Sequence, residues 1–428
     1  MTSGQSNPNG GERDTEASRD EDVAGKYHPR NDERREREWS MRWTIIVAVG
    51  ALAACSGEDT SPEPSGIDTA SEDTIALDTA ALDSTAADDG GVDSESDVGK
   101  EDTGPPTPTS GPRAYVIDAT HTDDLAWGPL TDARVGDIVI ANDLVRFVVR
   151  GGAEGLYMAG VGAGGVVDAG TPHTDRLQEI VPIGGFNSFG VTSVDVTKNG
   201  SDGVAEVTVT GPTKVPSLVN EYLQGLDRDT LVTQTYRLAE GARALEMVIE
   251  LADDTQSAQT GDVLFLGGDV DLRVDETGGW LASSGPDVSY GLVSDETMTP
   301  LELGGITIIL GPTVQPPVKW TRWLIQGDGS LSSVLDVIYE LRGMPVGTVE
   351  GTVDDPAAEV VAMDTEGSIV SSFRADDGGD FSGKLPVGLY TLEARGQGRP
   401  NGAPVQADVV EDKTLTVELS AEPASGLE

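Results

Sequence analysis

Few residues in this chain have the chemistry to hold a metal or to act as a strong nucleophile. Its 428 residues contain three histidines (His28, His121 and His173) and a single cysteine, Cys55. An internal disulfide and a cysteine-based zinc cluster are therefore excluded, because each needs at least two thiols. His121 and His173 have acidic neighbours, yet we interpret both as histidines of exposed loops and expect neither metal nor other cofactor.

Carboxylates are abundant, and their presence alone says little in a chain with 74 acidic and 28 basic side chains. Glu179, which follows Asp175 and precedes an apolar run, is the best-placed single acid, and we interpret it as structural. No Gly-x-Ser-x-Gly nucleophile elbow surrounds Ser188. We assign no catalytic residue and predict a protein that is not an enzyme.

A glycine-rich segment, residues 160–165, matches the Gly-x-Gly-x-x-Gly pattern of phosphate-binding loops. It runs into Val-Val-Asp at residues 166–168 and not into a helix. The phosphate-binding mechanism needs the N-terminus of a helix. We therefore interpret the segment as a tight connection between strands.

Four tryptophans are candidate platforms for a carbohydrate, because an exposed aromatic face stacks on apolar surface. They are Trp127, Trp280, Trp320 and Trp323. Sugar stacking is the leading functional hypothesis for these residues. A role in the core or in a contact between domains stays open as the alternative for each.

The chain before these tryptophans has the pattern of a signal peptide followed by a lipidation site. Arg42 is followed by the apolar run 43–54, which as a helix covers about 18 Å and is too short for a hydrocarbon core of about 30 Å. With Met41 this gives a signal peptide at residues 41–54. The end of the run, Leu52–Cys55, resembles the lipobox of bacterial lipoproteins. The resemblance implies lipidation of Cys55, cleavage just before it and, with Ser56 next, an outer-membrane or cell-surface location.

The segments around the signal peptide have the composition of unfolded chain. Residues 1–40 read as a disordered or mis-annotated extension, with Met41 as the true start. Between residues 56 and 110 there are fifteen acidic residues, one basic residue and no aromatic residue. Such a segment cannot bury enough apolar surface to fold, and its like charges extend it. We predict that residues 55–112 form an acidic disordered linker that lifts the folded part from the membrane.

The folded part is expected to be all-β. Residues 144–150 alternate after the turn Asn142-Asp143, and residues 230–238 and 243–251 form a second predicted hairpin. Only residues 330–342 have helical spacing, with Leu331, Val334, Leu335, Ile338 and Leu341 on one face. We predict a large β-sandwich domain over residues 113–345, with this helix at its end.

A smaller β-sandwich is predicted over residues 346–422. The runs 347–353, 360–364, 377–381 and 385–392 resemble the carboxypeptidase regulatory-like domain, a prealbumin-type sandwich. The resemblance implies an accessory module with a carbohydrate-binding-like fold. The predicted core comprises Val353, Val361, Phe381, Leu385, Tyr390, Leu392 and Val417.

Four segments of the larger domain carry a second resemblance. Residues 142–149, 164–168, 175–180 and 267–269 resemble the β-rich front of large secreted proteins in which a regulatory-like sandwich and a PHP-type phosphoesterase follow. The phosphoesterase holds its metals with several histidines, including a His-x-His pair, which this chain lacks. The resemblance therefore implies the non-catalytic front of that architecture.

Charge narrows the choice of partners. A formal net charge of −46 repels nucleic acid and anionic lipid head groups. We predict a cell-envelope lipoprotein, held to the membrane by Cys55, whose β-modules bind or scaffold a carbohydrate or an envelope protein. The alternative is a hydrolase, or the accessory half of an enzyme acting on extracellular sugars or phosphoesters.

The lipobox generates a test of processing. The mature protein should begin at Cys55 and partition into detergent, because several acyl chains give stable membrane attachment. Its intact mass should exceed that of residues 55–428 by the acyl groups. The Cys55→Ala variant should stay in the aqueous phase, and detergent partitioning of that variant would contradict the prediction.

Overall fold

The computed structural model describes residues 110–121, 125, 132–151, 164–170, 174–184, 188–214, 230–252, 258–266, 271–275, 278–303, 306–314, 318–396 and 401–421. The predictions for the signal peptide, for nearly all of the linker, and for Cys55, Trp127 and His173 lie outside these residues. None of the helices in the described ranges is both long and apolar enough to cross a membrane.

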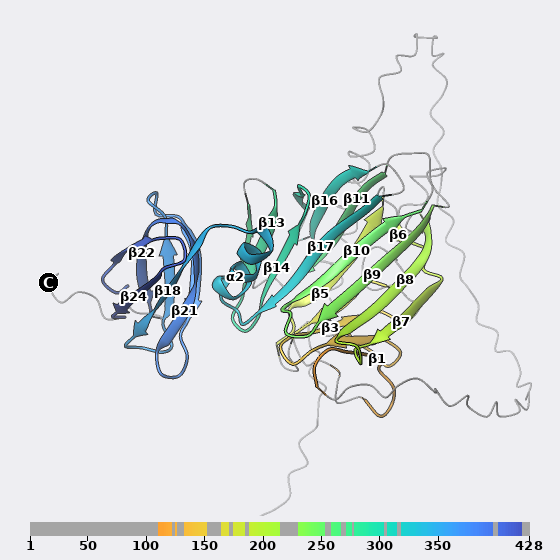
Figure 1. Cartoon of the computed structure of the whole chain (residues 1–428), viewed down its shortest axis with the longest axis horizontal. Coiled ribbons are helices and arrows are strands. Elements are labelled where there is room, and N and C mark those ends of the chain that lie inside the picture. The colour runs from red at the N-terminus through yellow and green to blue at the C-terminus, as the bar shows by residue number, and fades with distance from the viewer. Residues whose placement is uncertain are drawn as a thin grey trace, which may run out of the picture.

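The described chain is predominantly β-strand and forms two sandwiches, which confirms the all-β prediction (Figure 1). The larger sandwich has two antiparallel sheets. The first has the order β1-β2-β3-β4-β5-β11-β16-β15, and the second has the order β12-β13-β14-β17-β10-β9-β8-β6, with β7 also paired to β8. The first sheet contains β1 (Arg113–Val116), β2 (Ile138–Ala141), β3 (Arg146–Val149), β4 (Val166–Ala169), β5 (Leu177–Gly184), β11 (Ala258–Leu266), β15 (Thr299–Leu303) and β16 (Ile306–Val314). The second contains β6 (Ser188–Phe189), β7 (Ser193–Asn199), β8 (Val204–Lys214), β9 (Leu231–Ala239), β10 (Ala244–Leu251), β12 (Asp271–Val274), β13 (Trp280–Ser284), β14 (Ser289–Ser294) and β17 (Val318–Gly327).

Because apolar and polar residues alternate along the long strands, each strand buries its apolar face in the core. Along β10, Leu245, Met247, Ile249 and Leu251 are buried between the two sheets. The β9–β10 hairpin is present as predicted, but its turn lies at residues 240–243, one position later than the predicted 239–242. The turn between β2 and β3 is longer than the predicted two residues, because Asn142 caps it by accepting the backbone N–H groups of residues 144 and 145.

A buried ion pair joins the two sheets at the centre of the larger sandwich. Arg322 of β17 donates to the Asp262 carboxylate of β11, with 2.6 Å between Nη2 and Oδ1, and both side chains are fully buried. The same Nη2 lies 3.2 Å from the Gln234 side-chain oxygen, and the guanidinium lies 4.6 Å from the Trp320 ring centroid. A buried charge of this kind is tolerated only when it is paired and hydrogen-bonded.

Two tyrosines of the second sheet hold the two ends of β4 in the first. The Tyr236 hydroxyl donates to the Gly164 carbonyl and the Tyr290 hydroxyl to the Ala169 carbonyl, each over 2.6 Å. Both tyrosines are buried, so each hydroxyl needs such a partner. These bonds fix the position of β4 relative to the opposite sheet.

The helix α2 (Leu331–Arg342) begins and ends where the sequence predicted. Ser330 is its N-cap and accepts the Ser333 N–H over 3.3 Å, and Gly343 ends it in the left-handed conformation at φ 59°. The predicted apolar face is buried except for Leu341, which is 40% exposed; Tyr339 is buried at the same end of the helix.

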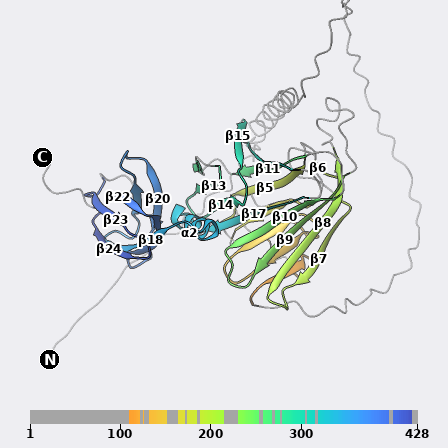
Figure 2. The same cartoon turned by 45° about the horizontal axis from the view of Figure 1, so that its top comes forward.

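The helix lies between the two sandwiches (Figures 1 and 2). One side packs on the outer face of β13, β14 and β17, and the other contacts β20 (Ile369–Arg374) and β21 (Asp380–Pro386) of the smaller sandwich. Asp336 accepts the backbone N–H of Lys384 over 2.7 Å, and Ser372 accepts that of Leu331 over 3.2 Å. The helix thereby covers β20 and β21, two edge strands that would otherwise be open to pairing with another strand.

Arginines from both sandwiches reinforce this contact at the two ends of β20. Arg273 of β12 donates to the Ile369 carbonyl, where β20 begins. Arg374, where β20 ends, donates to the carbonyls of Pro286 and Asp328, the latter over 2.5 Å. The two sandwiches are therefore joined by reciprocal hydrogen bonds as well as by the apolar face of α2.

The smaller sandwich packs a three-stranded sheet, β21-β18-β24, on a four-stranded sheet, β20-β19-β22-β23. Its remaining strands are β18 (Val346–Val353), β19 (Glu359–Met363), β22 (Gly388–Arg395), β23 (Val405–Val409) and β24 (Thr414–Leu419). All pairs are antiparallel except β18 with β24, which is parallel. The first and last strands of this module thus lie side by side in the same direction.

The core of this module contains most of the predicted residues. Phe381 is buried, with its ring centroid 5.7 Å from that of Phe373. Val361 is buried outside this core, because Val360 and Ala362 take the inward positions of β19. Tyr390 is only partly buried, and its hydroxyl donates to the Pro386 carbonyl over 3.0 Å.

The central ion pair generates a stability prediction. Arg322→Met should lower the free energy of unfolding by about 3–5 kcal/mol, because it leaves the Asp262 carboxylate buried without its counter-charge. Adding Asp262→Leu should recover most of that loss, since no buried charge remains. Urea denaturation of both variants measures this, and a double variant no more stable than the single one would contradict it.

The core position of Phe381 generates a second stability prediction. Phe381→Ala should cost about 3–5 kcal/mol, because it removes a buried ring and leaves a cavity next to Phe373. The thermal midpoint of the smaller sandwich should fall, while Leu389→Ala, an exposed position on β22, should leave it unchanged. An unaltered midpoint for Phe381→Ala would show that the ring does not support the core.

Candidate functional site

The structure separates the three described tryptophans. Trp320 faces the core with 1% exposure, and its Nε1 donates to the Ser294 hydroxyl over 2.7 Å. The sugar-platform prediction is therefore wrong for Trp320, because no face of its ring is free. Trp280 and Trp323 lie on the opposite, outer face of the second sheet, half-buried beside α2.

Trp280 and Trp323 belong to one row of side chains that crosses the second sheet at right angles to its strands. Each member is the register partner of the next, so the row has one side chain per strand, about 4.8 Å apart. From β13 to β7 the row reads Trp280, Val293, Trp323, Glu246, Arg237, Glu206 and Lys198. Its first half is apolar and packed beside α2, and its second half is charged.

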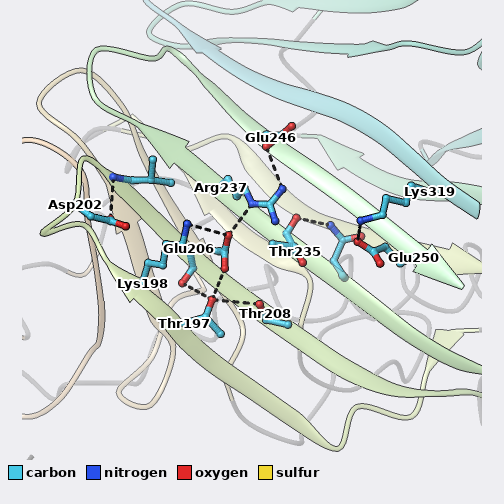
Figure 3. A network of polar contacts seen from close by, with 12 residues as sticks. Thr197, Lys198, Asp202, Glu206, Thr208, Thr235, Arg237, Glu246, Glu250 and Lys319 are labelled. Carbon is cyan, nitrogen blue, oxygen red and sulfur yellow. Dashed lines mark hydrogen bonds and ion pairs between the residues drawn. The ribbon is translucent and has the colours of Figure 1, made fainter. Parts of the chain in front are cut away.

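The charged half forms a connected network on an open sheet face (Figure 3). Arg237 lies between two carboxylates, with its Nε 2.6 Å from Glu206 and its Nη1 3.7 Å from Glu246. Thr197 donates to Glu206 over 2.8 Å from the neighbouring strand. Partial burial acts to raise the pKa of Glu206, but the bonds from Arg237 and Thr197 outweigh it and hold that pKa below its usual value. Glu206 is therefore ionised at neutral pH.

Two further rows on this face are mostly threonine. Thr321, Thr235 and Thr208 lie in one row with the apolar Val248, and Thr233 and Thr210 lie in the next, which ends with an ion pair between Lys319 and Glu250. Hydroxyl, carboxylate and guanidinium groups thus lie next to one another on this sheet face, and Trp323 borders them on one side. Such groups donate and accept hydrogen bonds in both directions.

A second cluster of functional groups is buried on the outer face of the first sheet. Asp168 of β4, Asp175 before β5 and Glu179 of β5 are each 4% exposed or less. Arg150, whose charge acts on Glu179, lies 3.3 Å from Asp137 and donates to the Asp132 carbonyl over 3.0 Å. The cluster thus holds more acids than bases.

Burial shifts the titration of these carboxyl groups. It raises the pKa of Glu179 to about 8, and Arg150 offsets only part of this. Burial and the neighbouring Asp175 raise the pKa of Asp168 to about 8, and burial raises that of Asp175 to about 6. Groups that titrate near neutrality are typical of functional sites, although structural networks produce the same shifts.

Sequence reasoning reached part of both sites. It singled out Glu179 and Asp175, and the structure places Asp168 beside Asp175. It missed the row from Glu206 to Glu246, because polar residues alternating along a strand mark a solvent face without showing which of them are neighbours. His121 is exposed and contacts Asp118, with 2.8 Å between Nδ1 and Oδ1. Within the described ranges, no group of three His, Cys, Asp or Glu side chains has the arrangement of a metal site.

Comparisons with known proteins give little to set beside this geometry. No protein-family model matches the chain, and no curated protein matches its sequence. The Bacillus anthracis TIE protein aligns with 43% of this chain and 38% of its own, at 12% identity and a TM-score of 0.15. Glycoside hydrolase family 81 CtLam81A from Clostridium thermocellum aligns with 65% of this chain and 41% of its own, at 12% identity and a TM-score of 0.28.

This chain therefore spans 38% and 41% of the lengths of these two structures. At such TM-scores neither likeness carries an argument about fold or function. The functional interpretation depends on the geometry of the chain itself.

Proposed function

We propose that the protein is a cell-envelope lipoprotein, anchored through Cys55, whose larger sandwich binds a carbohydrate on the outer face of its second sheet. The row that runs from Trp323 through Glu246 and Arg237 to Glu206 is the observation that supports this proposal. The smaller sandwich is then an accessory module that is held in fixed relation to this face by α2.

The chemistry of the row suits a polyhydroxylated ligand. Sugar hydroxyls both donate and accept hydrogen bonds, and the carboxylates accept while the guanidinium donates. Because Glu206, Thr197 and Arg237 already hold one another in place, little side-chain entropy remains to be lost on binding. Trp323 adds an aromatic edge against which an apolar sugar face can pack.

The buried carboxyl groups are the feature that would favour the alternative, a hydrolase. Glu179 and Asp168 have the raised pKa values expected of a general acid. Their burial argues for the binding function, because an acid–base group has to reach its substrate. Asp168 also accepts the backbone N–H groups of Asp132 and Ala133, which a catalytic carboxyl would have to give up. Hydrolysis of an array glycan, lost in Glu179→Gln, would favour the enzyme.

Binding is tested with the full chain on an array of neutral and acidic oligosaccharides, and then by calorimetry with the oligosaccharide that it retains best. Arg237→Gln should weaken binding about tenfold or more, because hydrogen bonds from charged groups contribute about 1.5–3 kcal/mol. Lys413→Gln, which removes the same charge from an exposed position in the smaller sandwich, is the matched control.

Two outcomes would contradict the proposal. The first is an array on which no glycan retains the chain. The second is an affinity that falls equally in the Arg237 and Lys413 variants, which would show a general effect of charge and no site on the sheet.

A further inference from the structure

The proposed binding face makes no use of the buried pair Asp168 and Asp175 on the first sheet. This pair lies where three parts of the sandwich meet: the connection between β4 and β5, the Tyr290 hydroxyl from the second sheet, and residues 132–137. We call residues 132–137 the cap. Ala133 of the cap packs over an apolar cluster on the outer face of the first sheet, which includes Val139, Val148 and Val167.

Hydrogen-bond accounting leaves one atom of the pair without a donor. Both oxygens of Asp168 accept backbone N–H groups of the cap, from Asp132 over 3.0 Å and from Ala133 over 2.9 Å. Asp175 Oδ1 accepts the N–H groups of Ala169 and Leu177 over 3.2 and 3.0 Å. Asp175 Oδ2 is buried and has no donor among the described groups.

The group that can serve as hydrogen-bond partner of Asp175 Oδ2 is the Asp168 carboxyl group. Asp175 Oδ1 accepts the N–H of Ala169, the residue after Asp168, so the two carboxyl groups are neighbours. Two ionised carboxylates repel each other and neither can donate, so we infer that a proton lies between them. With that proton in place every buried oxygen of the pair has a partner.

The surroundings offer little positive charge to replace the proton. The charged and titratable groups that face the pair from its neighbours are Asp132, Arg134 and Asp137 of the cap, Arg146 of β3 and Arg150 after it, Arg176 and Glu179 around the start of β5, and Tyr290 of β14. Arg146 is itself engaged. Arg150 is already engaged by Asp137 and Arg134 by Asp132. Arg176 is engaged by Asp287.

We propose that the Asp168–Asp175 pair is a proton-operated latch, in which the shared proton holds the cap on the first sheet and its loss releases the cap. Release uncovers the apolar cluster beneath Ala133. The latch lies on the first sheet, so it is independent of the binding face on the second.

The direction of the effect follows from linkage. Folding raises the pKa of Asp168 to about 8 and of Asp175 to about 6, both above the usual value of an aspartate. Groups with a raised pKa stabilise the folded state at low pH, and this contribution is lost as the pH rises through the folded-state values. The latch is therefore closed in mildly acidic medium and opens as the medium becomes alkaline.

Hydrogen exchange of the full chain, corrected for intrinsic rates, tests the latch. Between about pH 6 and about pH 9 the Asp132 and Ala133 amides should lose about tenfold or more of their protection, while amides in the middle of β10 keep theirs. Asp175→Asn places an amide group where Oδ2 stood and keeps Oδ1, so it donates to Asp168 without a proton. In this variant the two amides should stay protected at both pH values.

Two further variants complete the design. Asp168→Asn replaces one of the two oxygens that accept the cap N–H groups by a donor, so at least one of the two amides should lose protection at both pH values. Asp195→Asn, an exposed aspartate on β7, should lose protection like the unmodified protein. The proposal is overturned if the unmodified protein keeps its protection at about pH 9, or if the folded Asp175→Asn variant loses as much protection as the Asp195 variant.

Discussion

The buried ion pair between Arg322 and Asp262 determines how the larger sandwich is arranged. A strand that slips by one residue exchanges its two faces. An arginine that must meet a carboxylate inside the sandwich excludes such a slip for β17 and for its partner β10. With Arg322 directed inward, Trp323 and Thr321 are directed outward, and the register partners on β10, β9 and β8 follow. The register that buries Arg322 in the core therefore also fixes which side chains form the open polar face of the second sheet.

The same reasoning explains what could and could not be predicted from sequence. The alternation along β10 and the spacing and caps of α2 are local patterns, so their structures could be predicted, including most of the buried residues. The alternation along β17 is misleading, because the inward positions hold Trp320 and Arg322 and not only aliphatic residues. The reason for an inward arginine lies sixty residues away in Asp262, which no local pattern shows. The prediction that Val361 lies in the core of the smaller sandwich is wrong for a related reason. Two adjacent valines on β19 look alike in the sequence, and only the packing shows which one faces the core.

The candidate sites divide in the same way. The acidity of Asp175 and Glu179 is visible in the sequence, but the sharing of a proton depends on β4 and β5 lying next to each other and on the burial of both side chains. The row that contains Arg237 depends on the register of seven strands, although each strand by itself carries an ordinary polar face. Composition correctly indicated an acidic protein, whereas the sites arise where one basic side chain is placed among several acids.

The parallel pairing of β18 and β24 has a mechanical consequence. The smaller sandwich is entered through β18 and left through β24, which run side by side in the same direction. A force that pulls these two ends apart acts along the strands, so the hydrogen bonds between them share the load and have to break together. In an antiparallel terminal pair the same pull would separate the bonds one after another. This module is therefore built to resist extension between its two ends.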